Sequence, residues 1–243
     1  MKALLKIESL KQVRSMWIFA LGVGMPLIFF LIFSSTIDFG DPKVQAVFVR
    51  NYMLTMTSFS MSSFALFTFP LMLHEDRKNH WTDFLRYSPI SSSRYYLSKI
   101  YRVFLTYLVS ILLVFSVGAL VRGVSMSPWE WGGAAFLLIL TSIVYLAIGL
   151  LIGLLPSEQS MSVVANICFF ILAILGGSWM PISVFPEWVQ RICKFTPGYH
   201  VNQAVLSFVE NSRLNWKSLA FVAIYTFIFL AIVQYSKQKK EGN

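Results

Sequence analysis

The sequence predicts an all-α integral membrane protein with six transmembrane helices. The first observation is the composition, since 56% of the 243 residues are hydrophobic and only 13% are charged. The second is the mean hydropathy of +0.66. A soluble domain usually carries charge on about a quarter of its residues. The third observation is that the apolar residues lie in runs of about 20, the length a helix needs to cross a bilayer. We therefore expect lipid to solvate most of the surface.

Six apolar segments qualify as spans, and none of them contains Asp, Glu, Lys or Arg: 17–36, 52–73, 103–121, 132–155, 162–180 and 219–235. The first follows a basic start but is long enough to span, which favours an uncleaved helix over a signal peptide. The third holds many Leu, Ile, Val and Phe residues, each worth about −0.3 to −0.6 kcal/mol near the bilayer centre. The second is rich in Ser and Thr, which suits close helix packing or a water-lined face better than lipid.

The basic residues predict the orientation. With the N-terminus in the cytoplasm, 13 of the 20 Lys and Arg residues lie inside, which agrees with the positive-inside rule. Both termini are then cytoplasmic. The seven basic residues left outside are Lys43, Arg50, Arg122, Arg191, Lys194, Arg213 and Lys217. Because the positive charges flank apolar runs, the net charge of +9 is explained by membrane topology, and we expect no nucleic-acid partner.

Three non-spanning segments remain within a single transmembrane domain that covers residues 1–243. Residues 1–15 place Ala3, Ile7, Leu10 and Val13 on one helical stripe, which predicts an amphipathic helix on the inner membrane surface. Residues 181–216 carry Pro181, Pro186 and Pro197 with several aromatic residues. That segment is too apolar for a free loop and too broken for a span, so we expect a re-entrant outer hairpin between the fifth and sixth spans.

The longest inner loop, residues 74–102, begins with a dense charge cluster of Glu75, Asp76, Arg77 and Lys78. Trp81, Phe84 and Leu85 follow at helical spacing and predict a short helix with one aromatic face. Such a face is costly in water unless something covers it. The residues alone leave two coverings open, the membrane interface and a partner protein.

The absences narrow the possible functions. The sequence contains no Gly-Lys dipeptide and therefore no Walker A phosphate loop, and it contains no HExxH, CxxC or GxSxG motif. We predict no catalytic residue, no metal site and no cofactor in this chain. The spans carry no charged residue, whereas ion-driven carriers usually embed one in the membrane. An autonomous pump and a membrane enzyme are therefore disfavoured.

Taken in order, these features resemble the ABC-2 family of membrane permeases, the transmembrane subunits of bacterial ATP-binding cassette exporters. The resemblance covers essentially the whole chain. It rests on the six-span plan with a basic amphipathic start, on the inner-loop pattern from Glu75 to Lys99, and on two outer motifs. The outer motifs are Gly176-Gly177-Ser178-Trp179-Met180-Pro181-Ile182 with the following Phe185-Pro186-Glu187-Trp188, and Thr196-Pro197-Gly198-Tyr199-His200.

The resemblance implies a permease subunit for an apolar or amphipathic cargo such as a drug, lipid or peptide. Two copies of a separate ATPase would bind ATP and Mg, and a second permease subunit, identical or related, would complete the complex in the cell membrane. The inner loop would hold the coupling helix. Its candidate ATPase contacts are Glu75, Asp76, Arg77, Lys78, Trp81, Phe84 and Leu85. The outer re-entrant element would include Gly176, Gly177, Pro181, Pro186, Trp188 and Pro197.

For the substrate pathway the candidates are Ser58 and Ser62 of the second span and Asn166 of the fifth, although ordinary helix packing is the simpler explanation for small polar residues. Gly149 and Gly153 are expected to form a close-packing site. The alternative to an exporter is a non-transporting membrane module, namely an immunity, sensing or assembly protein.

Overall fold

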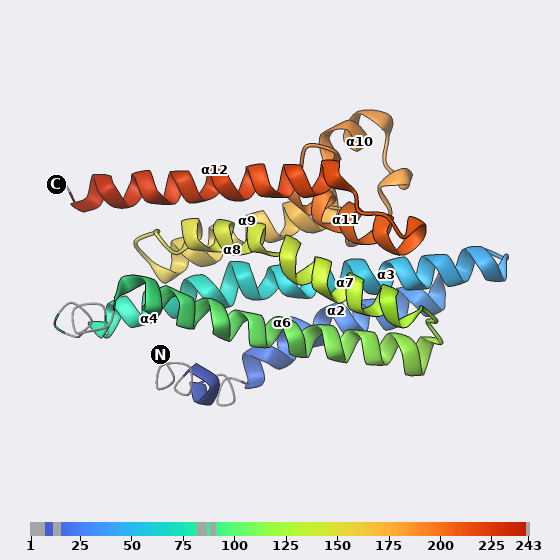
Figure 1. Cartoon of the computed structure of the whole chain (residues 1–243), viewed down its shortest axis with the longest axis horizontal. Helices are drawn as coiled ribbons and strands as arrows, with labels where there is room; N and C mark the ends of the chain where they lie inside the picture. Colours follow the sequence, from blue (N-terminus) through green and yellow to red (C-terminus); the bar gives the residue numbers. More distant parts are fainter. Residues whose placement is uncertain (1–7, 12–15, 82–86, 88–90, 242–243) are drawn as a thin grey trace.

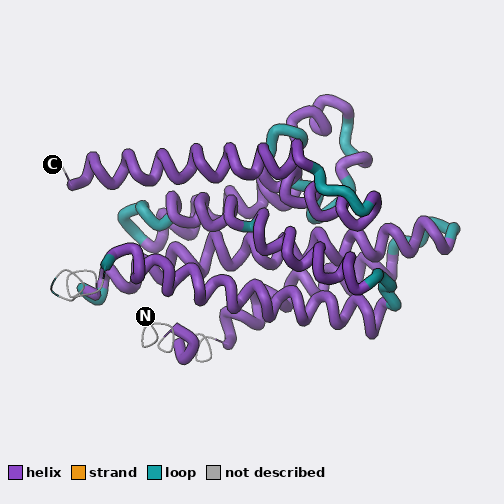
Figure 2. Tube along the Cα trace, viewed as in Figure 1, coloured by secondary structure: helices purple, strands orange, loops and turns teal. Residues whose placement is uncertain are grey.

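The computed structural model describes residues 8–11, 16–81, 87 and 91–241, and every regular element in that part of the chain is helical (Figures 1 and 2). The all-α fold class is thereby confirmed. The elements are α2 (Met16–Thr36), α3 (Pro42–Ser63), the π-helix η1 (Phe64–Thr68), α4 (Phe69–Lys78), α6 (Ser92–Arg122), α7 (Pro128–Thr141), α8 (Ile143–Ile152), α9 (Glu158–Leu175), the 3-10 helix η2 (Ile182–Val184), α10 (Glu187–Cys193), α11 (Pro197–Asn211) and α12 (Trp216–Glu241).

Five helical stretches of the described chain are long and apolar enough to cross a membrane: Pro42–Lys78, Arg94–Arg122, Pro128–Ile152, Glu158–Leu175 and Trp216–Ser236. They correspond to the second to sixth predicted spans. The first predicted span is helical as α2, and its stretch Gly22–Thr36 is apolar but shorter. A sixth crossing therefore stays a prediction.

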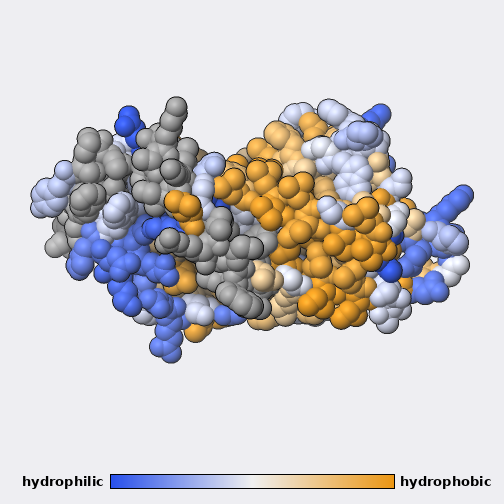
Figure 3. Space-filling model, turned by 90° about the horizontal axis from the view of Figure 1, so that it is seen from below, coloured by the Kyte–Doolittle hydropathy of each residue, from blue (hydrophilic) through white to orange (hydrophobic). Residues whose placement is uncertain are grey.

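The helix ends gather at two opposite ends of the bundle. The end of α4, the α8–α9 turn and the C-terminus lie together, and the α2–α3 and α6–α7 turns lie with α10 at the opposite end (Figure 1). On the face seen in Figure 3, apolar side chains gather between the hydrophilic ends. With 31 residues, α6 is about 46 Å long and exceeds the roughly 30 Å hydrocarbon core, so its polar start projects beyond the apolar band.

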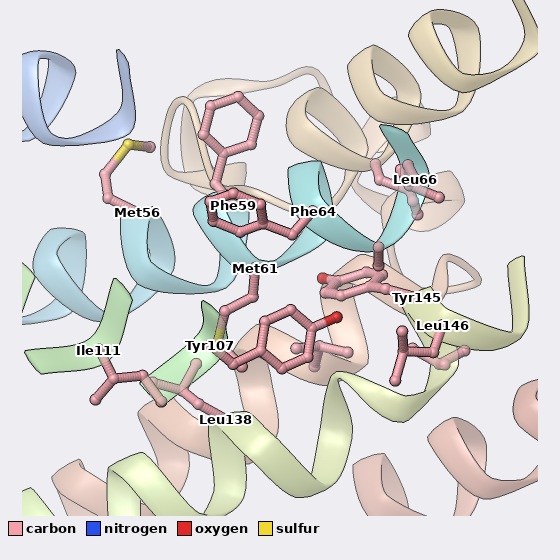
Figure 4. Close-up of a cluster of buried hydrophobic side chains, with 14 of the residues drawn as sticks. Met56, Phe59, Met61, Phe64, Leu66, Tyr107, Ile111, Leu138, Tyr145 and Leu146 are labelled. Carbon is pink, nitrogen blue, oxygen red and sulfur yellow. The ribbon is translucent and has the colours of Figure 1, made fainter. Parts of the chain in front are cut away.

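The Ser/Thr-rich second span forms the centre of the bundle. Helices α3, η1 and α4 continue one another from Pro42 to Lys78, and most of their apolar stretch is buried inside the protein. Their small side chains allow neighbouring helices to approach closely: Ser60 donates to the Gly22 carbonyl at 3.0 Å and accepts from Ser110 at 2.8 Å. Of the two predicted environments, close helix contact is the one observed. Figure 4 shows the surrounding core of Met56, Phe59, Met61, Phe64, Leu66, Tyr107, Ile111, Leu138, Tyr145 and Leu146.

The π-turn η1 accommodates a proline inside this central helix. Pro70 has no N–H to donate to the carbonyl four residues earlier, and its ring clashes with that carbonyl in a regular α-helix. The wider turn resolves the conflict, with the Phe69 N–H bonded to the Phe64 carbonyl. At this level α8 packs directly on η1. A Cβ on Gly149 would lie only 2.1 Å from the Ala65 carbonyl oxygen, so Gly149 is confirmed as a close-packing residue.

The fourth and fifth predicted spans differ from the observed helices: the fourth is interrupted, and the fifth ends earlier than predicted. The fourth is divided at Ser142 into α7 and α8, because Thr141 and Ser142 bond back to carbonyls of the preceding turn at 2.7 and 2.8 Å and bend the helix. The fifth ends at Leu175 rather than Met180. Gly177 adopts φ of 74°, a left-handed conformation that glycine permits and that terminates the helix.

Candidate functional site

The end of the bundle that the sequence predicts to be cytoplasmic, here called the inner end, contains a buried ionic cluster, which we define as Glu8, Asp76, Tyr95, Lys99 and Arg102. All five residues are buried, and Lys99 is only 1% exposed. They come from three separate parts of the chain: the helical turn at residues 8–11, the inner end of α4, and the first turns of α6. Tyr95, Lys99 and Arg102 share one face of α6 because they are spaced at i, i+4 and i+7.

Lys99 is the centre of this cluster. Its Nζ lies 2.6 Å from Asp76 Oδ2 and 2.7 Å from Glu8 Oε1. The Tyr95 hydroxyl donates to the same Asp76 oxygen at 2.8 Å, and Arg102 Nη1 lies 3.5 Å from Glu8 Oε2. Two carboxylates are thus balanced by two buried cations, and the half-exposed Lys11 adds a third, with its Nζ 3.8 Å from Asp76 Oδ1. Buried charges are tolerated when they are paired and hydrogen-bonded in this way, so the cluster fixes the N-terminal turn, α4 and α6 relative to one another.

The predicted coupling residues lie in different environments. Asp76 belongs to the ionic cluster and faces the interior of the protein, whereas Glu75 and Lys78 are exposed. Arg77 donates to the Gly153 carbonyl, and Lys78 lies 3.6 Å from Glu158 at the start of α9. These contacts join α4 to the α8–α9 turn.

The aromatic part of the predicted coupling helix is only partly described. Trp81 is half-buried and packs against the hydrophobic core. Phe84 and Leu85 lie outside the described residues, as does most of the predicted amphipathic helix 1–15. Helices α4 and α6 extend into the predicted loop from both sides, so the connection between them covers residues 79–91 only. The coupling role of this connection stays a prediction.

The predicted pathway residues lie in different environments. Ser58 and Ser62 are buried inside the bundle: Ser58 lies 3.3 Å from the Tyr145 hydroxyl, and Ser62 donates to the Phe59 carbonyl at 2.7 Å. Their positions fit helix packing. Asn166 is different, because it is exposed midway along α9, and within the described residues its amide donates to the Ser162 carbonyl of its own helix, at 2.8 Å.

At the outer end, the two predicted motifs meet in space. Gly176 and Gly198 are in direct backbone contact, since a Cβ on Gly198 would lie 3.3 Å from the Gly176 Cα. Asn202 of α11 fastens the turn after α9 by donating to the Gly176 carbonyl at 2.8 Å and to the Ser178 hydroxyl at 3.0 Å. Gly177 and Pro181 line a cavity of about 310 Å³ between this turn, α3 and α11.

The remaining outer residues bound short helices. Pro186 caps α10, Trp188 is exposed on it, and Pro197 begins α11. Helix α11 has 15 residues, which corresponds to about 22 Å and is too short to cross the hydrocarbon core. It packs against α3, α7, α9 and α12. The predicted hairpin is therefore a set of three short helices, and its depth in the membrane stays a prediction.

Sequence reasoning missed Glu8, Lys99 and Arg102 as site residues. Lys99 and Arg102 were counted among the inner basic residues, and Glu8 was not singled out. One signal was available: a lysine and an arginine three residues apart at the start of an apolar helix lie on one face, close to the membrane, where an unpaired charge is costly.

The comparisons with known proteins agree with this architecture. A sequence model described as ABC-2 type transporter matches residues 1–209. The chain is also 26% identical over 237 residues to a Bacillus subtilis (strain 168) protein named "Putative transport permease YvfS". That alignment covers 97% of this chain and 96% of the relative, so the similarity extends over both the inner and the outer ends of the bundle.

Proposed function

Because the chain belongs to the ABC-2 transporter family, we propose that it is the membrane-spanning subunit of an ATP-driven exporter for an apolar or amphipathic cargo. Membership in this family makes the chain a membrane transport subunit that associates with an ABC ATPase, and such subunits are generally not catalytic themselves. The proposal adds the direction of transport, the cargo class (a drug, lipid or peptide) and the place where the ATPase acts.

The observation that carries the coupling proposal is the ionic cluster at the inner end. Lys99 bridges Asp76 of α4 and Glu8 of the N-terminal turn. A force on the connection between α4 and α6 would therefore reach three parts of the chain at once, rather than bending one helix end. In this mechanism ATP and Mg, bound by two copies of the ATPase, close the ATPases against residues 79–91. The exposed Glu75 and Lys78 are the charged contacts, and Trp81, Phe84 and Leu85 are the apolar anchors.

A second permease subunit, identical or related, is expected to pack near α9. This helix is the second least buried of the five candidate spans, and only 28% of its apolar stretch is buried inside the protein. Asn166 is exposed at its middle, where contact with lipid would be unfavourable for a carboxamide. A pathway or subunit contact along α9 would provide polar surroundings for Asn166. We place the complex in the cell membrane with both termini cytoplasmic, on the strength of the positive-inside bias.

Reconstitution with the partner ATPase tests the proposal. Proteoliposomes that contain both subunits should hydrolyse ATP faster than the ATPase alone and should transport an amphipathic probe in an ATP-dependent manner. The double variant F84E/L85E should lose stimulation and transport while still inserting normally. The control F39E introduces a carboxylate at an exposed aromatic residue near the opposite end, between α2 and α3, and should behave like the unmodified protein.

The alternative, a non-transporting immunity, sensing or assembly module, makes the opposite prediction. In that case the chain would neither copurify with an ATPase nor change its rate of hydrolysis, and F84E/L85E would be indistinguishable from F39E in every transport measurement.

A further inference from the structure

The outer end of the bundle contains a second cavity, of about 360 Å³, between α10, α11 and the start of α12. Three basic residues line it: Arg191, Lys194 and Lys217. No acidic residue lines it among the described parts of the chain. Three of the seven basic residues on the predicted outer side thus gather around one cavity. The positive-inside rule disfavours such an accumulation on this side, so the cluster calls for a reason of its own.

The lysines of this cavity have no acidic partner within the described chain. Arg191 lies 3.9 Å from Glu187, but neither Lys194 nor Lys217 makes an ion pair there. Both lysines are exposed. Their charges are therefore available to a ligand.

A buried histidine with an unused nitrogen provides independent evidence for a ligand. His200 is 3% exposed and its ring stacks on Phe221, with centroids 4.3 Å apart. Its Nδ1 lies 3.4 Å from the Ser218 hydroxyl, whereas Nε2 is buried without a hydrogen-bond partner. Burial lowers the pKa of His200, a hydrogen bond to the Lys194 backbone opposes this shift, and nearby Lys217 adds to it; the net downward shift favours the neutral ring. When Nδ1 accepts from Ser218, Nε2 carries the proton and can donate to an oxygen at the cavity.

The surroundings indicate a site at the level of the lipid headgroups. Phe195 lines the cavity, and Trp188 and Trp216 belong to α10 and the start of α12, the helices that border it. All three are about 70% exposed (67–72%), as is typical of aromatic residues at a membrane interface. Further along α12, past the cavity, Ile224, Phe227 and Ile228 are exposed on one side of the helix. A ligand with a charged head and apolar tails matches both the basic cavity and the apolar side of α12, whereas a small free anion would contact only the basic cavity.

From this arrangement we propose that the cavity between α10, α11 and α12 binds the phosphate group of an anionic phospholipid whose acyl chains lie along α12. Arg191, Lys194 and Lys217 supply the positive charge, and His200 supplies a neutral N–H donor. The site does not include the pathway or coupling residues. The lipid-binding proposal can therefore be correct or wrong independently of the proposed exporter function.

The test measures lipid binding to the purified full-length chain by native mass spectrometry and by thermal stabilisation. Phosphatidylglycerol should bind more tightly than phosphatidylcholine of the same acyl composition. The double variant K194Q/K217Q should weaken phosphatidylglycerol binding by about 30-fold, since each basic residue near an anionic surface contributes about fivefold. Because both lysines are exposed, these replacements preserve the fold, and K194R/K217R should restore binding.

The matched control is K43Q/R213Q, which removes two exposed outer charges that do not line the cavity. It should retain the preference for phosphatidylglycerol. Equal binding of both lipids, or equal losses in the two double variants, would overturn the proposal. If inorganic phosphate at millimolar concentration stabilises the protein as much as the lipid does, with the same dependence on Lys194 and Lys217, the lipid assignment is wrong and the site binds a free anion.

Discussion

Replacing Lys99 by methionine removes the central cation of the ionic cluster and nearly preserves the volume of the side chain. The Nζ group lies 2.6 Å from Asp76 and 2.7 Å from Glu8, and the side chain is almost completely buried. Removing one partner of a buried ion pair costs about 3–5 kcal/mol. In K99M both carboxylates lose their nearest cation and are left with longer contacts, Asp76 with Lys11 at 3.8 Å and Glu8 with Arg102 at 3.5 Å. For a chain of this length each kcal/mol lowers the melting temperature by about 2–4 °C. K99M should therefore melt about 6–20 °C below the unmodified protein.

Thermal unfolding of the purified chain, followed by tryptophan fluorescence, measures this effect. The control is K78M, which removes a lysine whose side chain is 71% exposed and lies 3.6 Å from Glu158. An exposed pair contributes less than about 1 kcal/mol, so K78M should stay within about 4 °C of the unmodified protein. Adding D76N to K99M should recover part of the loss, because it removes a buried carboxylate that has lost its nearest cation. If K99M and K78M melt together, the cluster does not stabilise the inner end and the reasoning fails.

Three further predictions concern the packing and the outer element. G149A should cost about 1–3 kcal/mol because the added methyl overlaps the η1 backbone, whereas G132A, with open space around it, should be neutral in the same melt. S58A should leave transport unchanged and lower the free energy of unfolding by at most about 1.5 kcal/mol. N166L, by contrast, should slow transport. Slow transport by S58A together with normal transport by N166L would contradict the assignment of Ser58 to helix packing. N202L should expose the turn after α9 to proteolysis, because it removes both hydrogen bonds that fasten this turn, and unchanged cleavage would show that the turn is held by other contacts.

The sequence predicts the helical class and the position of most spans because the transfer of apolar side chains into lipid depends on local composition. The ends of the helices depend on other interactions. Helix α3 begins at Pro42, ten residues before the predicted span, because its polar first turns remain helical without being apolar. The early end of α9 depends on the conformation of Gly177, and the division at Ser142 depends on side-chain bonds to the preceding turn.

The site is less accessible to sequence reasoning than the fold. The Ser and Thr content of residues 52–73 shows that they suit close contact or water, but only the tertiary arrangement distinguishes the two, and it places Ser58 inside the bundle. Asp76 was assigned with its neighbours to an exposed charge cluster. Its burial depends on Lys99, 23 residues later, and on Tyr95, which local patterns do not connect to it.

Photo-crosslinking from the connection between α4 and α6 to the ATPase tests the central claim most directly. Tyr87 is 93% exposed in that connection, and Phe39 is 48% exposed at the opposite end of the bundle. A benzophenone amino acid at position 87 should crosslink to the ATPase, and the yield should change when ATP is added, whereas the same group at position 39 should give no crosslink. Crosslinking from position 39 but not from position 87, or from neither position in an active complex, would contradict the assignment of the inner end as the coupling site.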